Sequence, residues 1–172
     1  MRKALLAIFL LFSFNLYGAG AKIDIPKYDW SWKGFFGTYD RASAQRGLKV
    51  YREVCAGCHS MNYLSYRNLA DLGFSEDHIK AIAAEHLVLD GPNDEGEMFE
   101  RDGIPSDQFV NPYLNEKAAR AANNGAYPPD LSLIVKARPK GADYIKALLL
   151  GYVDPPENMK VPKGQHYNKF LS

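Results

Sequence analysis

The order of apolar and polar residues predicts four helices separated by long irregular stretches. In the first two of these helices, mainly apolar residues recur every three to four positions, the spacing that places them on one face of a helix. Helix-terminus residues flank the segments, with Asp40, Ser75 and Asn115 as N-caps and Gly151 as a stop. The predicted helices run from 41 to about 54, from 75 to about 86, from 115 to 122 and from about 142 to 150.

The stretches between the predicted helices are irregular. The chain has 10 prolines and 14 glycines in 172 residues, and runs with the two-residue period of a strand are few. Aromatic residues crowd residues 22–38 without helical periodicity, which favours an arm lying against a surface or an apolar wall. The predicted fold class is therefore mainly α, with long loops.

The first 21 residues have the pattern of a secretory signal peptide. Arg2 and Lys3 provide the positive start, residues 4–17 the apolar core and residues 19–21 the small residues typical of a cleavage site. The apolar core is 14 residues long, short for a membrane span, and a tethering signal anchor stays open as an alternative. Residues 22–172 are predicted to form one domain.

Charge is balanced overall but uneven along the chain. The net charge of +1 shows no general basic bias, so nucleic acid is not an expected partner. Residues 85–107, however, hold eight acidic residues against Arg101 alone, a local charge of −7. Three interpretations stay open: an ordinary solvated loop, an acidic surface that steers a basic redox partner, or a Ca²⁺ site at residues 94–97. The last lacks the regular alternation of an EF-hand loop.

Residues 55–59, Cys-Ala-Gly-Cys-His, carry the most specific chemistry of the chain. This spacing is the attachment signature of a c-type haem, in which two thiols bond the porphyrin and the next residue ligates iron. Cys55 and Cys58 are the only cysteines in the sequence. A thiol–disulfide enzyme would need a βαβ context, and a zinc site a second ligand pair. Neither pattern is visible, so covalent haem is the prediction.

His59 is the predicted proximal ligand of the iron. His78, His86 and His166 fit ordinary surface or core positions. A sixth ligand would be a methionine sulfur or a second imidazole. Spacing alone favours Met159, because a distal ligand usually comes from the far end of the fold. A loop methionine that fills a gap is the alternative.

Residues 123–132 form a rigid turn followed by an apolar step. Pro128 and Pro129 fix the backbone and leave carbonyl groups free to accept a hydrogen bond from an imidazole N–H. Arg138 and Tyr144 follow at a distance along the chain that suits contact with two haem propionates. Without the haem, each is an ordinary surface residue.

From about residue 28 to its end, the chain resembles cytochrome c1, the haem subunit of the ubiquinol–cytochrome c reductase (bc1) complex. Several matching motifs are long, which makes the resemblance specific. They are residues 37–41 (GTYDR), 45–47 (QRG), 50–51 (VY), 53–55 (EVC), 58–61 (CHSM), 90–93 (DGPN), 96–99 (GEMF), 118–125 (AARAANNG), 128–132 (PPDLS) and 151–152 (GY).

The resemblance implies a cytochrome c-like fold around one covalent haem c. Cys55 and Cys58 would hold the haem and His59 would be the proximal ligand. The residues implied to line the haem are Asn123, Ala126, Pro128 and Pro129, and those implied to meet the propionates are Arg138 and Tyr144.

The resemblance also implies a function, partners and a location. The chain would carry one electron at a time from the Rieske iron–sulfur protein to a soluble or membrane-bound cytochrome c, beside cytochrome b. It would have no catalytic site of its own. It would lie on the periplasmic side of the inner membrane, with the acidic stretch as a docking and subunit-contact surface. A free periplasmic cytochrome c is the alternative.

One departure from the family pattern concerns the sixth ligand. In the family, the axial methionine follows a segment similar to residues 166–170, and a C-terminal membrane helix follows later. The sequence ends at Ser172, before either. We therefore expect a chain truncated at the C-terminus that lacks the usual sixth ligand, which argues against Met159. A five-coordinate or misligated haem of lowered potential is the expected consequence.

Overall fold

The structure is a computed structural model that describes residues 25–171, so the predicted signal peptide at 1–21 lies outside the described residues. The chain forms two compact units. One is Pro26–Lys146, and the described part of the other is Ile25 with residues 147–171. No helix within residues 25–171 has both the length and the apolar composition to cross a bilayer. The single domain expected over 22–172 stays a prediction.

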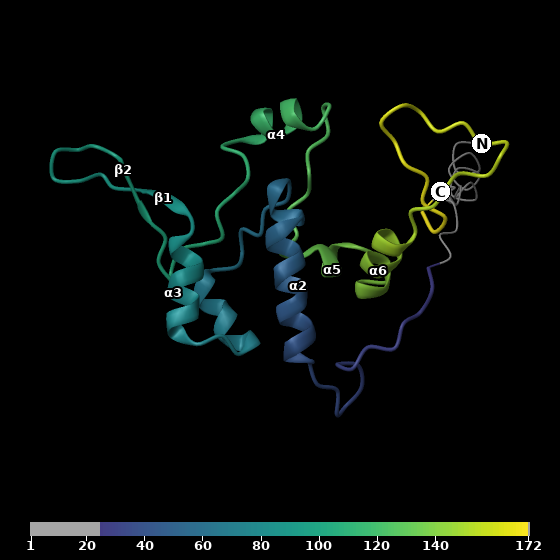
Figure 1. Ribbon diagram of the computed structural model, residues 1–172, viewed down its shortest axis with the longest axis horizontal. Coiled ribbons are helices and arrows are strands. Elements are labelled where there is room, and N and C mark those ends of the chain that lie inside the picture. The colour runs from purple at the N-terminus through teal and green to yellow at the C-terminus, as the bar shows by residue number, and fades with distance from the viewer. Residues whose placement is uncertain (1–24, 172) are drawn as a thin grey trace, which may run out of the picture. The chain divides into compact units, whose positions relative to one another are not determined.

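The four helices expected from the sequence are present, and the mainly α class is confirmed (Figure 1). They are α2 (Arg41–Glu53), α3 (Glu76–Ala84), α4 (Glu116–Ala122) and α6 (Ala142–Leu150). Each predicted N-cap accepts a hydrogen bond from the backbone N–H three residues later, at 3.1 Å for Asp40, 3.3 Å for Ser75 and 3.0 Å for Asn115. Local capping chemistry therefore places three of the helix starts.

The sequence pattern missed the shorter elements. These are the 3₁₀ turns η1 (Cys55–Gly57) and η2 (Tyr66–Leu72), the one-turn helix α5 (Ile134–Ala137), and the strands β1 (Leu87–Asp90) and β2 (Phe99–Asp102). The strands form an antiparallel hairpin in which Leu87 lies opposite Asp102 and Asp90 opposite Phe99. Each strand has only four residues and its sequence lacks a clear alternation, which is why periodicity did not reveal it.

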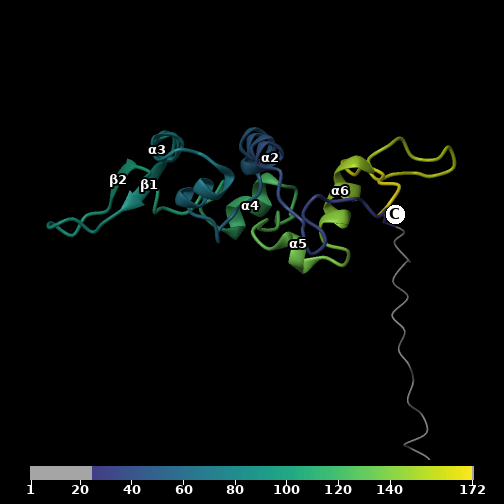
Figure 2. The same ribbon diagram turned by 90° about the horizontal axis from the view of Figure 1, so that it is seen from below.

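The apolar core of the larger unit lies where α2, η2 and α3 meet, and η2 contacts both helices (Figures 1 and 2). Its centre is aromatic: Tyr66 stacks on Phe109 with ring centroids 4.7 Å apart, and Tyr51 meets Phe109 edge-on at 6.0 Å. The buried members are Tyr51, Tyr66, Leu69, Ile79, Ile82, Ala83 and Phe109. Tyr51 lies on the last turn of α2, so this core anchors the residues that follow it.

The aromatic arm expected near the N-terminus packs in part against α6. The Trp30 indole N–H donates to the Asp143 carboxylate at 2.6 Å, and Trp30 stacks on Trp32 at 4.5 Å. Phe35 and Phe36 differ from that expectation, since they are 95% and 90% exposed. The arm is therefore held by one buried carboxylate together with ring stacking.

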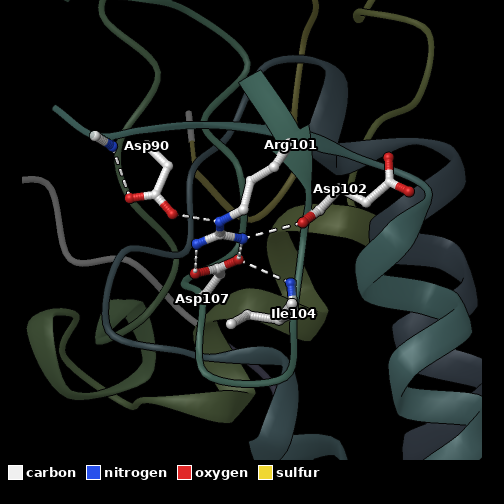
Figure 3. Close-up of polar contacts among 6 residues, drawn as sticks. Asp90, Arg101, Asp102, Ile104 and Asp107 are labelled. Carbon is white, nitrogen blue, oxygen red and sulfur yellow. Dashed lines mark hydrogen bonds and ion pairs between the residues drawn. The ribbon is translucent and has the colours of Figure 1, made fainter. Parts of the chain in front are cut away.

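Arg101, the single lysine or arginine of the acidic stretch at 85–107, binds two carboxylates of the same stretch (Figure 3). Its guanidinium forms two bonds to Asp107, at 2.7 and 3.0 Å, and another to Asp90. Hydrogen bonds from Arg101 lower the pKa of both carboxyl groups. The Asp107 backbone carbonyl accepts from the Tyr66 N–H at 3.0 Å, which joins the base of the hairpin to the core. The acidic hairpin is thus fixed to the core through Arg101 and Asp107.

Leu69 tests the core, because its side chain is 1% exposed. We expect Leu69→Ala to lower the free energy of unfolding by about 2–5 kcal/mol, since it removes buried contacts and leaves a cavity. Urea denaturation followed by circular dichroism measures the change. Leu114→Ala is the matched control, because Leu114 is 99% exposed and its truncation should leave the unfolding midpoint unchanged. Equal effects of the two substitutions would contradict the assigned core.

Candidate haem-attachment site

The Cys-x-x-Cys-His segment forms a tight turn directly after α2. The carbonyl oxygen of Cys55 accepts two hydrogen bonds, from the Cys58 N–H at 3.0 Å and from the His59 N–H at 2.8 Å. Cys55 is half-buried, Cys58 is exposed, and both are free thiols. One helical turn therefore carries two thiols and an imidazole, the groups that covalent haem attachment requires.

The His59 ring is oriented by a residue from a distant part of the sequence. Its Nδ1 lies 2.8 Å from the carbonyl oxygen of Pro129, seventy residues later. A carbonyl can only accept, so Nδ1 carries the proton and Nε2 keeps its lone pair for a metal. The sequence did not distinguish the carbonyl groups of Pro128 and Pro129 as acceptors for the imidazole. In the structure the acceptor is the Pro129 carbonyl.

Two further hydrogen bonds align the segment after His59 with the segment after Pro129. The Leu131 N–H donates to the Ser60 carbonyl at 2.9 Å, and the Tyr63 N–H donates to the Ser132 hydroxyl at 3.0 Å. The two segments therefore run alongside each other for several residues. The ring contact of His59 is part of this extended pairing.

Tyr51 supports the turn from the core side. Its hydroxyl donates to the His59 carbonyl oxygen at 3.2 Å. Burial raises the pKa of Tyr51 to about 12, and the negative charge of Asp130 adds to the shift. The neutral phenol is therefore the form present at physiological pH, and it can donate this hydrogen bond.

Asn123 acts on the Cys58 side of the turn through a tyrosine that sequence analysis did not single out. The Asn123 amide donates to the Tyr113 hydroxyl at 3.1 Å and to the Ala119 carbonyl at 2.7 Å. The Tyr113 hydroxyl in turn lies 3.8 Å from the Cys58 sulfur. Nothing in the sequence marks Tyr113, because a lone tyrosine in a proline-flanked loop belongs to no motif.

The remaining predicted residues are less closely joined to the turn. Pro128 is half-buried and Ala126 is exposed, with its N–H donating to the Asn123 carbonyl at 2.9 Å. Arg138 and Tyr144 are half-buried, the first directly after α5 and the second in α6. Within residues 25–171 no hydrogen bond or ion pair links either side chain to the turn. Their expected contact with propionates stays a prediction.

A small cavity adjoins Cys58, Tyr113 and Pro128. Its volume of about 110 Å³ is below the several hundred Å³ of typical ligand pockets, so it suits a few water molecules rather than a porphyrin. The fit of this site to a haem therefore rests on its donor set. Two free thiols lie one turn apart, and an imidazole with its Nδ1 proton fixed presents Nε2 as a ligand.

The other two sequence hypotheses concern Met159 and the acidic stretch. Met159 is 44% exposed, and its N–H donates to the Pro156 carbonyl at 2.8 Å. The expectation that Met159 is not the sixth ligand stays a prediction. No three His, Cys, Asp or Glu side chains within the described residues gather into a metal-binding group, so the Ca²⁺ interpretation of residues 94–97 gains no support.

A thiol pair and an oriented imidazole in one turn define the class of c-type cytochrome attachment sites. The chain belongs to the Cytochrome C1 family, whose model matches residues 30–172. It is 55% identical over 149 residues to mitochondrial cytochrome c1 1, a heme protein of Arabidopsis thaliana. The matched region covers 87% of this chain and 48% of the relative.

Two more relatives extend the comparison to bacteria and fungi. Cytochrome c1 of Rhodospirillum rubrum is 56% identical over 130 residues, 76% of this chain and 48% of the relative. The mitochondrial cytochrome b-c1 complex catalytic subunit of Candida albicans is 51% identical over 147 residues, 85% of this chain and 51% of the relative. The chain thus spans about half the length of these curated relatives.

Tyr51→Phe tests the support of the turn and its pH dependence. The lost hydrogen bond should lower the free energy of unfolding at neutral pH by about 0.5–1.5 kcal/mol. Because folding raises the Tyr51 pKa from 10 to about 12, its contribution is complete below pH 10 and is lost as pH rises towards 12. The variant should therefore lose less stability than the unchanged chain across this window, as measured by urea unfolding.

Tyr63→Phe is the control for that series, because Tyr63 is 73% exposed. It should keep the alkaline dependence of the unchanged chain. Burial also raises the pKa of Tyr66, so the Tyr51→Phe variant should keep part of the loss of stability at alkaline pH. An alkaline profile identical in Tyr51→Phe and the unchanged chain would contradict the assignment.

Proposed function

We propose that this chain is an electron carrier with one haem c attached through Cys55 and Cys58 and ligated by His59. The observation that carries the proposal is the hydrogen bond between His59 Nδ1 and the Pro129 carbonyl, within the turn that holds both thiols. A disulfide enzyme has no need of an imidazole held in this tautomer. A metal ligand does.

Attachment needs only groups that the chain holds. Each thiol would add across one vinyl group of the porphyrin, with sulfur bonding to one vinyl carbon and hydrogen to the other. Nothing leaves and no oxidant is consumed, provided that Cys55 and Cys58 are both reduced, as free thiols are. The exposure of Cys58 leaves one of the thiols open to the porphyrin.

When bound, the haem supplies one iron that takes up and releases a single electron, with no bond made or broken in a substrate. The chain supplies the ligand and its orientation. His59 would donate the Nε2 lone pair to the iron, and the Pro129 carbonyl would keep the proton at Nδ1. We assign the walls of the site to Asn123, Ala126, Pro128 and Pro129, and contact with the propionates to Arg138 and Tyr144.

Family membership supports a place in the bc1 complex, since the Candida albicans relative is named as a subunit of the cytochrome b-c1 complex. We infer that this chain accepts one electron from the reduced Rieske iron–sulfur protein, which becomes oxidised. It then passes one electron to a ferric cytochrome c, which becomes ferrous. We place it beside cytochrome b, on the periplasmic side of the inner membrane.

The acidic hairpin supports docking of a basic cytochrome c. Asp94, Glu95 and Glu97 lie in the exposed connection between β1 and β2. Because Arg101 ties the hairpin to the loop beside the core, these charges are held on an ordered element. A fixed patch of one sign speeds the encounter with a partner of opposite sign.

Covalent attachment is tested by expressing the chain with a haem-maturation system. We expect the polypeptide to gain the mass of one haem and to stain for haem on a denaturing gel. Cys55→Ser/Cys58→Ser should lose both signals, since no thioether can form. His59→Ala should lower the yield and change the visible spectrum of whatever haem attaches. A chain without added mass under conditions that mature another c-type cytochrome would refute the proposal.

The docking surface is tested by stopped-flow electron transfer from the reduced chain to a basic ferric cytochrome c. Glu95→Gln/Glu97→Gln should lower the second-order rate several-fold at low salt, where the charges are least screened. Asp154→Asn/Glu157→Gln removes two exposed acidic residues outside the hairpin and is the matched control. Equal rates for all three proteins at low salt would contradict docking at the hairpin.

A further inference from the structure

One carboxylate joins the segment that carries His59 to the segment that carries Pro129. Asp130 Oδ2 accepts from the Ser60 hydroxyl and from the Asn62 N–H, both at 2.8 Å. Its Oδ1 accepts from the Ser132 N–H at 2.8 Å. Ser60 directly follows the imidazole, and Asp130 directly follows the carbonyl that the imidazole contacts.

The Asp130 carboxylate therefore joins the two segments by hydrogen bonds directly beside the His59–Pro129 contact. In each segment the bonded residue, Ser60 or Asp130, is the next one along the chain. Asp130 reaches back across a sequence separation of 70 residues to Ser60 and of 68 to Asn62. A further hydrogen bond, with the donor on the other segment, runs from the Leu131 N–H to the Ser60 carbonyl oxygen. Two of the hydrogen bonds that join the two segments therefore end on Asp130, next to the contact between His59 Nδ1 and the Pro129 oxygen.

The side chain is suited to this role because it accepts on both oxygens. Burial raises the pKa of Asp130, but hydrogen bonds from Ser132, Asn62 and Ser60 outweigh it, so the pKa lies below its ordinary value. The carboxylate is then ionised near neutral pH and bonded by neutral donors. An asparagine of the same shape has one acceptor oxygen and one donor nitrogen, and it cannot satisfy both sides.

We propose that Asp130 is the positioning residue of the proximal ligand, which holds the Pro129 carbonyl against His59 Nδ1 and so sets the donor strength of Nε2 towards iron. The inference rests on the proposed function, in which His59 ligates a haem. A close, linear bond from Nδ1–H makes the imidazole more basic and favours ferric iron. Loosening the bond should therefore raise the reduction potential.

The test compares Asp130→Asn with Asp143→Asn in the matured chain. Asp143 is the matched control, because it too is a carboxylate that accepts from several donors. Asp143 is buried, whereas Asp130 is half-buried. The donors to Asp143 are the Trp30 indole N–H at 2.6 Å, the Tyr28 N–H at 3.3 Å and Lys33 at 3.4 Å. It holds the aromatic arm and contacts neither His59 nor Pro129. Both variants remove one carboxylate, so both should unfold at lower urea concentration.

Reduction potential and backbone exchange separate positioning from general stability. With the sixth position saturated by added imidazole in every sample, Asp130→Asn should raise the potential by up to about 59 mV, a tenfold change in the ferrous-to-ferric ratio. Hydrogen exchange should speed up at the Asn62, Leu131 and Ser132 amides. Asp143→Asn should change neither measurement.

A milder variant covers the case in which Asp130→Asn does not mature. Ser60→Ala removes one of the three donors and should shift the potential in the same direction by a smaller amount. Haem attachment with potentials equal in the unchanged chain and in the Asp130 or Ser60 variant would overturn this inference alone. An equal shift in Asp143→Asn would also overturn it. Failure of the unchanged chain to bind haem would overturn the proposed function as well.

Discussion

The hydrogen bond from His59 Nδ1 to the Pro129 carbonyl is the contact on which the rest of the site depends. It joins residues seventy positions apart and fixes the proton on one ring nitrogen, which leaves a lone pair on the other. Around it, backbone pairing aligns the two segments, and Tyr51 links the turn to the aromatic core. The site therefore lies next to the aromatic core. Tyr51 belongs both to α2 and to this core, so the packing of α2 helps to position the turn.

Two carboxylates organise this protein in similar ways. Asp130 accepts hydrogen bonds from three neutral donors beside the turn. Asp143, in α6, accepts a hydrogen bond from Trp30 of the aromatic arm. Arg101 has the complementary role in the acidic stretch, where it gathers Asp90 and Asp107. In each case a charge within the fold is matched by several hydrogen bonds, which gives direction as well as stability. Long loops can keep one conformation by this means.

Much of the helical structure was predictable, because its signals are local. Asp40, Ser75 and Asn115 cap helices within three residues of their own positions, and apolar spacing marks the buried face. The hairpin at 87–102 was not predictable, since its strands have four residues each and depend on Arg101 for their attachment. Sequence analysis did not single out Tyr113, and it listed Asp130 only as part of the 128–132 motif, without a role. The reason is related, since each acts on a residue more than fifty positions away.

The sequence by itself determined which chemical groups the turn carries, because two thiols and an imidazole lie within five consecutive residues. It also determined where the main helices begin, through caps that act over three residues. Only the tertiary structure decided which proline carbonyl meets His59, which side chains hold that carbonyl in place and how the acidic stretch is tied to the core. Those outcomes depend on contacts between distant segments, and such contacts exist only once the aromatic core has brought the segments together.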